Sequence, residues 1–464
     1  MIMGNKFRNI AFCAATAFAC LGMISCGGAK KTAGYNYPNG KPNMGITSTS
    51  KVDTVRWKED RNAKLPIYSS GNLQDSHYPP NNPGNGGVII DNKGTYVPAT
   101  PTDLKSSYNL AVLLPFFTDK ASPDSIYSKA SFALDFYAGT KIALDSLSHT
   151  DANLTVTTLD SKTNFYDLLN RYEVSHADLV LGPVEKDNIS AAAAFSTSRG
   201  ITLISPYDPT GDLPDNNPNF VQVKPSFKTH CEALTKSVRA KYTPEQVILV
   251  GRSKDNESAR FKLFQDANND FEKTSHSIHF GEWVIDDETS FNVNDYLNAS
   301  KVTVFILPSW NEAFVTAFLK QLDASPHRSR TVVYGMPQWM DISGMNPLYE
   351  RLGVHISSST YIDPESPNVK DFRKKFFDKF AKLPNNYSFL GYDCTLYFVE
   401  EMKKYGTKFP AFLEQDPRKV LHTQFSFSPV FKAGTDNFSI PMKYENKFVN
   451  ILKYSNGAFR PDEY

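Results

Sequence analysis

The stretch "DLVLGPVEKDNIS", from Asp178 to Ser190, changes from an apolar run to a polar one within a few residues. Its apolar part has the length and composition of a buried β-strand, and Gly182-Pro183 ends the run with two residues that turn the backbone. Residues 188–198 then have helical spacing. Such a turn cradles a phosphate, holds a catalytic group or lines a binding crevice. The glycines and lysine that a phosphate loop needs are missing here, which leaves the last two alternatives.

The same alternation of strand and helix continues along the chain. Strands are expected at "YNLAVLLPFF" (108–117), "LTVTTLD" (154–160), "DLVLGP" (178–183) and "ITLISP" (201–206). A second series has "QVILVG" (246–251), "SIHFGEWVI" (277–285), "KVTVFILP" (301–308) and "RTVVYG" (330–335). Strands that alternate with helices pair in parallel through right-handed crossovers. The sequence therefore predicts two α/β units, followed by two helices and a β-rich tail.

The charges of the 464 residues almost cancel. Lys and Arg number 50 and Asp and Glu 49, for a formal charge of +1, while 41% of the residues are hydrophobic. The chain is long and apolar enough for two or three domains with cores of their own. No overall field attracts it to nucleic acid, so nucleic acid is not an expected partner.

The N-terminus has the pattern of a secretory signal, with Lys6 and Arg8 before an apolar stretch too short to span a membrane. This stretch ends in "MISC", which resembles the lipobox of bacterial lipoproteins. Residues 1–25 are therefore expected to be a signal peptide and Cys26 the lipidated residue; the alternative is an ordinary cleaved signal. Acyl chains would hold the protein in the cell envelope, facing the periplasm. Gly27, rather than Asp, favours the outer membrane over the inner membrane.

Residues 26–107 are rich in Pro, Gly, Asn, Ser and Thr and have no sustained apolar period. This composition predicts a flexible stalk behind the lipidated cysteine, with room for a short hairpin at 87–98. Beyond Cys26, the mature chain would retain only Cys231 and Cys394, each within a helical pattern. Two buried free thiols are expected, and a single bridge is the alternative.

From about Tyr108 to Tyr454, the order and spacing of the segments resemble a type I periplasmic binding protein of the leucine/isoleucine/valine-binding kind. "AVLLPF" with "FYAGTKIALDSL" is similar to the family's first strand and helix, "LVLGPV" and "ITLISP" to two strand ends, and "SFLGYDCTLYFVEEMKKYG" to its late helix. The resemblance implies an α/β fold of two doubly wound parallel-sheet lobes joined by three hinge crossings. Lobe one would comprise 108–223 plus 364–415, and lobe two 226–356 plus 423–454.

The resemblance also implies a ligand between the lobes, at the carboxyl ends of the strands, where ligands of open α/β sheets bind. The candidate ligand-binding residues are Phe117, Val184, Ser205, Tyr207, Asp208, Ser309, Trp310, Gln338, Trp339 and Tyr392. Amino-acid-binding members have small and hydroxyl residues where this chain has "GPVEKD" and "ISPYDPTG", which argues against a free amino acid. Asp208 would contact the ligand or cap its own turn, and the aromatic residues would bind a ring or pack the lobes together.

Enzyme motifs are absent or misplaced in the sequence. The S-x-x-K at 48–51 lies in the expected stalk, and His276 and His279 would face opposite sides of a strand, so neither catalysis nor a metal or cofactor is expected. We expect a non-enzymatic lipoprotein that binds a small molecule for an ABC-type transporter or a sensor, with a transporter permease as partner. The alternative is an outer-membrane lipoprotein that docks on and regulates a peptidoglycan synthase, like the activators of penicillin-binding proteins.

Overall fold

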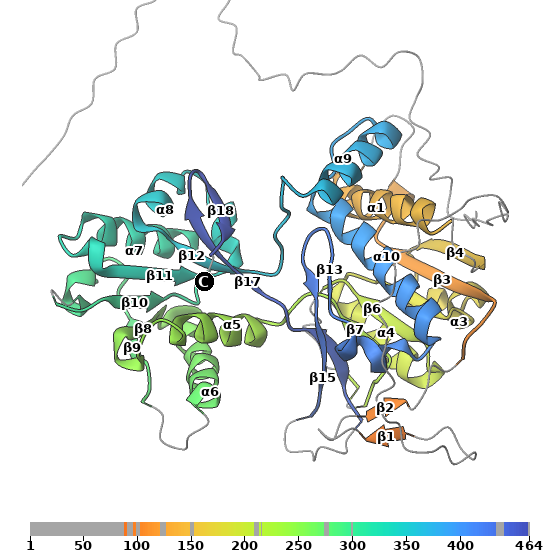
Figure 1. The fold of residues 1–464 in the computed structure, drawn as a ribbon, viewed down its shortest axis with the longest axis horizontal. Coiled ribbons are helices and arrows are strands. Elements are labelled where there is room, and N and C mark those ends of the chain that lie inside the picture. The colour runs from red at the N-terminus through yellow and green to blue at the C-terminus, as the bar shows by residue number, and fades with distance from the viewer. Residues whose placement is uncertain are drawn as a thin grey trace, which may run out of the picture. The chain divides into compact units, whose positions relative to one another are not determined.

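The computed structural model describes residues 103–120, 127–148, 153–207, 213–214, 216–272, 278–297, 300–432 and 440–462, and two short strands at 88–90 and 96–98. Two seven-stranded sheets with helices packed on them dominate this part (Figure 1). The expected α/β fold with two doubly wound, mostly parallel sheets is confirmed. The expected signal peptide, Cys26 and nearly all of the expected stalk lie outside the described residues.

Lobe one is built on a sheet of strand order β15-β16-β7-β6-β5-β3-β4. Its strands are β3 (Ser107–Leu114), β4 (Asn153–Asp160), β5 (Leu179–Leu181), β6 (Thr202–Ser205), β7 (Phe220–Gln222), β15 (Phe427–Val430) and β16 (Lys443–Asn446). All neighbours pair in parallel except β15, which runs antiparallel to β16 at one edge. Within β3, Val112 and Leu113 face opposite cores. Both faces are covered, which explains why the strands are continuously apolar.

The helices of lobe one lie on the two faces of this sheet. They are α1 (Ser131–Leu147), α2 (Phe165–Asn170), α3 (Tyr172–Ser175), α4 (Lys186–Arg199), α9 (Pro367–Phe380) and α10 (Asn386–Tyr405). Helices α1 and α10 share a core with one face, and α2, α3 and α4 share a core with the other. Helix α9 packs against α1 and α10 through Phe372 and Phe376.

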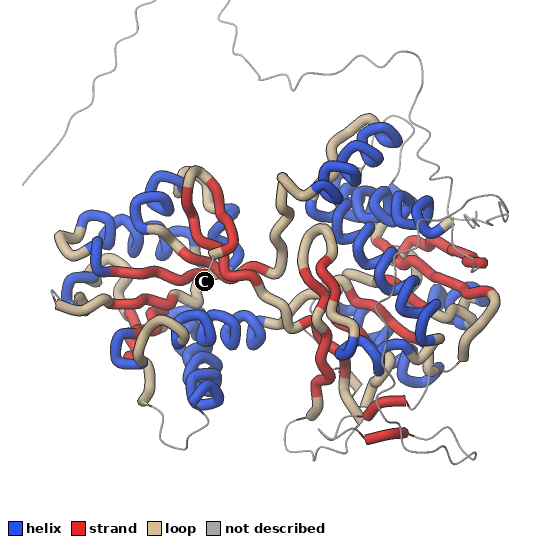
Figure 2. The backbone as a smooth tube through the Cα atoms, in the orientation of Figure 1, coloured by secondary structure: helices blue, strands red, loops and turns tan. Residues whose placement is uncertain are grey.

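Lobe two is built on a sheet of strand order β18-β17-β12-β11-β10-β8-β9. Figure 2 draws its strands in red and its helices in blue. Its strands are β8 (Val247–Arg252), β9 (Gly281–Ile285), β10 (Thr303–Ile306), β11 (Thr331–Gly335), β12 (His355–Ser358), β17 (Asn450–Ser455) and β18 (Ala458–Pro461). Its helices are α5 (Phe227–Arg239), α6 (Phe261–Glu272), α7 (Glu312–Ala324) and α8 (Asn346–Leu352). The pairing is parallel from β9 to β12, and β17 and β18 add an antiparallel edge.

The chain passes three times between the two sheets: at 223–226 after β7, at 359–366 after β12 and at 447–449 after β16. The last crossing divides the β-rich tail. Strands β15 and β16 join lobe one, and only β17 and β18 join lobe two, unlike the expected placement of 423–454 wholly in lobe two. The reason is that Tyr444 of β16 lies opposite Val221 of β7 and is buried in the core of lobe one.

The turn at Gly182-Pro183 is required by the packing of the sheet. Gly182 has a φ of +92°, and a Cβ atom there would lie 2.1 Å from the carbonyl oxygen of Leu113. Only glycine fits at this position, since any side chain would push β5 away from β3. The turn thus ends β5 and lets the chain enter α4.

Two smaller expectations are confirmed. Strand β1 (Val88–Ile90) pairs antiparallel with β2 (Tyr96–Pro98), which forms the hairpin expected at 87–98. Cys231 and Cys394 are buried free thiols. Burial raises the pKa of both thiols above their usual range, so they stay protonated and unreactive.

Glu445, on β16, connects lobe one to the first crossing. Its side chain is 3% exposed and accepts hydrogen bonds from the Ser226 backbone N–H at 2.9 Å and from the Thr229 hydroxyl at 2.6 Å. Lys447 and Lys443 flank the carboxylate at 3.2 and 3.4 Å. Burial opposes the charge, but the two lysines and the two hydrogen bonds outweigh it and lower the pKa of Glu445 to about 2.

We expect Glu445→Gln to reduce the free energy of unfolding by about 3 kcal/mol at neutral pH. Because the folded-state pKa is depressed, the stabilisation is complete above the ordinary value of 4.5 and is lost as the pH falls toward about 2. Urea unfolding at a series of pH values measures the difference between the two proteins, which should shrink through this window. Glu365→Gln is the control, because that side chain is 82% exposed. A difference that does not change with pH would contradict the assignment.

Candidate ligand-binding site

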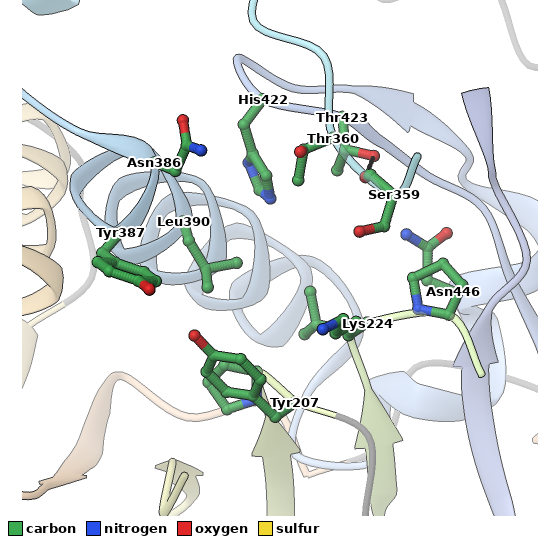
Figure 3. A pocket seen from close by; sticks show the side chains of 13 residues that line it. Tyr207, Lys224, Ser359, Thr360, Asn386, Tyr387, Leu390, His422, Thr423 and Asn446 are labelled. Atoms are coloured by element: carbon green, nitrogen blue, oxygen red, sulfur yellow. Dashed lines mark hydrogen bonds between the residues drawn. The ribbon is translucent and has the colours of Figure 1, made fainter. Parts of the chain in front are cut away.

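A cavity of about 250 Å³ lies where strands β6 and β7 end (Figure 3). We call it the hinge cavity, because residues from all three crossings, or from directly beside them, line it. The lining residues are Pro206, Tyr207, Val223, Lys224, Pro225, Ser359, Thr360, Asn386, Tyr387, Leu390, His422, Thr423 and Asn446. Carboxyl ends of parallel strands are the place where open α/β sheets bind ligands, so the hinge cavity is the candidate site.

Two tyrosines form one wall of the hinge cavity. The Ser205 hydroxyl donates to the carbonyl oxygen of Tyr207 at 2.8 Å and fixes the turn after β6. The ring of Phe132 packs edge-to-face against Tyr207 and Tyr387, with centroids 5.7 and 4.8 Å apart. Burial, and to a lesser extent the nearby Tyr387, raises the pKa of Tyr207 above its usual range. Its hydroxyl therefore stays protonated and is available to donate a hydrogen bond.

The first turn of α10 supplies Asn386, Tyr387 and Leu390. Asn385 caps this helix, because its side-chain oxygen accepts from the backbone N–H groups of Tyr387 and Ser388, both at 3.1 Å. Asp135 of α1 accepts from the Asn385 side chain at 2.6 Å. The start of α10 is thus fixed to α1, and the three lining residues have defined places.

His422 lies in the turn between β13 (Arg418–Lys419) and β14 (Gln424–Phe425), and it is bonded to Asp393 of α10. One carboxylate oxygen of Asp393 accepts from the His422 ring at Nδ1 and from its backbone N–H at 2.9 Å, and the other accepts from the Leu421 N–H at 3.1 Å. The two side chains are 3% and 2% exposed. Figure 3 shows the imidazole projecting into the cavity.

The second crossing is held against the same turn. The Thr423 hydroxyl donates to the carbonyl oxygen of Ser359 at 2.7 Å, and the Tyr361 N–H donates to that of His422 at 2.8 Å. The Ser358 hydroxyl donates to the carbonyl oxygen of Thr360 at 2.8 Å. Local hydrogen bonds, rather than a helix or a strand, therefore hold Ser359 and Thr360 in place at the hinge cavity.

The charge of the lining comes from one lysine. Lys224, exposed on the first crossing, has its Nζ atom 5.5 Å from the centroid of the Tyr207 ring. None of the described lining residues is Asp or Glu, since Asp393 lies behind His422 and is not part of the lining. The described wall is thus rich in hydroxyl and amide groups and carries a single ammonium group.

Of the candidate residues in lobe one, Tyr207 lines the hinge cavity. Ser205 stands directly behind it, with its hydroxyl bonded to the Tyr207 backbone. Asp208 and the expected lipidation site Cys26 lie outside the described residues.

The other candidates in lobe one pack elsewhere. The ring of Phe117 lies 5.3 Å from the Lys162 ammonium. Val184 packs against the core that α1 and α10 share with the sheet. The ring of Tyr392 packs against Phe372 of α9, with centroids 4.7 Å apart. None of the three is among the described lining residues of the hinge cavity.

The candidates in lobe two follow the strand ends, as expected, but bond within their own lobe. The Ser309 hydroxyl donates to Glu257 at 2.7 Å, and the indole N–H of the fully buried Trp339 donates to the Ser309 carbonyl oxygen at 2.8 Å. Trp310 is 47% exposed, with the Arg260 guanidinium 3.6 Å from its ring centroid. Gln338 is exposed.

Most of the lining was not predicted from the sequence. The missed residues are Lys224, Ser359, Thr360, Asn386, Tyr387, Leu390, His422, Thr423 and Asn446, together with the flanking Val223 and Pro225. The sequence did contain one feature that predicts the position of some of these residues. Asn385 is a typical N-cap residue, and it places the start of α10 at Asn386.

Two larger cavities are also present. One of about 700 Å³ is lined by the β17–β18 hairpin and by residues of the second and third crossings, with Tyr361, Phe448 and Arg460 among them, and it shares Thr423 with the hinge cavity. One of about 530 Å³ includes Asp178 and Ile201, which precede β5 and β6, and so lies at the amino ends of the strands. This second cavity does not have the position expected for a ligand of a parallel sheet.

Solved structures of other proteins identify the fold that this architecture shares. A protein assigned to branched-chain amino acid ABC transport in Rhodospirillum rubrum superposes with a TM-score of 0.54 at 14% identity, covering 77% of this chain and all of the other. The chain has the type I periplasmic-binding fold. A branched-chain amino acid ABC transporter periplasmic ligand-binding protein of Burkholderia xenovorans is similar, with a TM-score of 0.52 at 12% identity, covering 77% and 94%.

A regulatory protein has the type I periplasmic-binding fold as well. The C-domain of Haemophilus influenzae LpoA, a regulator of PBP1A, matches with a TM-score of 0.52 at 12% identity, covering 76% of this chain and all of the domain. No family model and no curated protein sequence matches the chain. The likeness at these identities establishes the fold alone, which transport proteins and a synthase regulator share.

The described residues contain neither a candidate membrane span nor a candidate metal site. No helix in this part of the chain combines the length and the apolar character that crossing a bilayer requires. Nor do three or more His, Cys, Asp or Glu side chains gather there as metal ligands would.

Proposed function

We propose that the protein is a non-enzymatic binding protein of the cell envelope, anchored by lipid on Cys26 in the outer membrane, that captures a small molecule in the hinge cavity. The position of this cavity carries the proposal. It combines strand ends of lobe one with residues on or beside each of the three crossings, so a bound molecule contacts the segments about which the lobes would move. Delivery to an ABC-type transporter or a sensor is the role that follows.

Ligand capture predicts that a small molecule will raise the thermal unfolding temperature, because binding to the native state alone adds about 2.7 kcal/mol at a ligand concentration 100 times Kd. A thermal shift screen of amino acids, short peptides, sugars, sugar acids and cell-wall fragments tests this. Tyr207→Ala should abolish the shift by removing one wall of the cavity. Tyr172→Ala, which removes a 73% exposed tyrosine on α3, should leave it unchanged. No shift with any compound would remove the support for ligand capture.

A second candidate function is docking on a peptidoglycan synthase. Two observations favour it: Ser309 and Trp339 are bonded within lobe two, and the hinge cavity lies below the usual range of about 300–1,000 Å³ for ligand sites. Cross-linking in cells followed by mass spectrometry separates the two functions. Recovery of a transporter permease supports capture and delivery, and recovery of a peptidoglycan synthase supports regulation.

A further inference from the structure

We propose that the hinge cavity selects a small hydroxylated carboxylic acid, of which a sugar acid is an example. His422 would form a hydrogen bond with a ligand hydroxyl, and Lys224 would bind the carboxylate. This rests on the proposed function, that the cavity captures a small molecule, and it specifies the chemical class of that molecule.

The His422 ring is fixed, and one of its polar atoms is left for a ligand. A carboxylate only accepts hydrogen bonds, so the contact with Asp393 places a hydrogen on Nδ1 and leaves Nε2 as the ring atom that can bond to a ligand, as an acceptor in the neutral ring and as a donor in the charged ring. No described residue is recorded as a hydrogen-bond partner of Nε2, although the side chain is only 3% exposed. The imidazole lines the cavity, and a hydroxyl both donates and accepts, so a ligand hydroxyl fits against Nε2 in either form of the ring.

Lys224 determines the charge of the ligand. It has no recorded ion pair with a described residue, and no described lining residue is acidic. A ligand carboxylate would find a partner in this ammonium group, and charge-assisted hydrogen bonds of this kind are the strong ones. A ligand ammonium group would meet Lys224 as a like charge and would find no carboxylate in the described lining.

The remaining lining fits the hydroxylated part of the ligand. Tyr207, Tyr387, Thr360 and Asn386 contribute hydroxyl and amide groups, which both donate and accept hydrogen bonds. Leu390 contributes an apolar surface for the carbon face of the molecule. A volume of about 250 Å³ suits a molecule of the size of a single sugar ring.

Isothermal titration with D-glucuronate and D-glucose tests the charge preference, because these two molecules share a ring and differ in one carboxylate. We expect D-glucuronate to bind at least about tenfold more tightly, as one charge-assisted hydrogen bond would give. Lys224→Gln should remove this preference, and His422→Phe should weaken both sugars. Lys228→Gln is the matched control, since that lysine is 64% exposed on α5 and pairs with Glu232. It should bind D-glucuronate like the unmodified protein.

Three results would overturn the inference. If D-glucose or L-leucine binds and is displaced by no acid, the inference fails while the proposed function stands. If neither these compounds nor any compound of the thermal shift screen binds, the inference and the proposed function both fail. Should His422→Phe not fold, Lys224→Gln still decides the matter, because the lysine is exposed and the variant leaves the core intact. An unchanged preference for D-glucuronate in Lys224→Gln would also contradict the assignment.

Discussion

Replacing Gly391 by alanine is expected to destabilise lobe one by about 4 kcal/mol, a loss that few single substitutions cause. Gly391 lies where α10 meets α1, and a Cβ atom there would stand 2.0 Å from the carbonyl oxygen of Phe136. The neighbouring atom belongs to backbone and cannot rotate away. The added methyl group would therefore separate two helices that share a core, and it would displace the start of α10 from the hinge cavity.

Urea unfolding followed by circular dichroism measures this loss. Gly281→Ala on β9 is the control, because the nearest atoms to its added Cβ would lie at 3.5 Å, an ordinary contact. That variant should change the free energy of unfolding by no more than about 0.5 kcal/mol. A Gly391→Ala protein as stable as the control would show that α1 and α10 do not approach each other this closely.

Asp393→Ala is expected to cost about 3–5 kcal/mol, because it leaves buried partners without their charged acceptor. Three donors lose their bonds: the backbone N–H groups of Leu421 and His422 and the His422 ring. The turn that carries His422 would lose its attachment to α10. The change should thus lower both the free energy of unfolding and the affinity for a ligand in the hinge cavity.

The matched control for this change is Asp378→Ala. Asp378 pairs with Lys374 one helical turn away, and its side chain is 58% exposed. Exposed pairs of this kind contribute about 0.3–0.5 kcal/mol, so the control should stay close to the unmodified protein. If the two variants unfold at the same urea concentration, the Asp393–His422 pair is not the attachment described above.

Much of the fold could be predicted from local sequence, because strands buried on both faces read as apolar runs. The apolar run before Gly182-Pro183 predicted a strand that ends there, and β5 (Leu179–Leu181) does end at this turn. The strand pairing near the end of the chain could not be predicted in this way. Strand β16 pairs with β7, so that Tyr444 lies opposite Val221, and neither residue carries a mark of its distant partner. Pairing over such a separation is decided by burial in the assembled core, which a single sequence does not display.

The candidate site also has residues that local sequence predicted and residues that it did not. Tyr207 was predicted because it directly follows a strand, and strand ends in a parallel sheet gather at one edge. Asp393 and His422 were missed, since a helix and a turn 29 residues apart bring them together. The aromatic residues Trp310 and Trp339 were placed correctly at strand ends, but the hydrogen bonds and stacking that hold them in lobe two depend on side-chain packing.

The most direct test of ligand capture at the hinge is a crystal structure of the protein with the compound that gives the largest thermal shift. Our account predicts electron density for the ligand between Tyr207, Lys224 and His422, with one polar atom within hydrogen-bond distance of the His422 Nε2. Density for the ligand at another place, such as beside Trp310, or a hinge cavity filled by the side chains of Tyr207 and Tyr387 would contradict it.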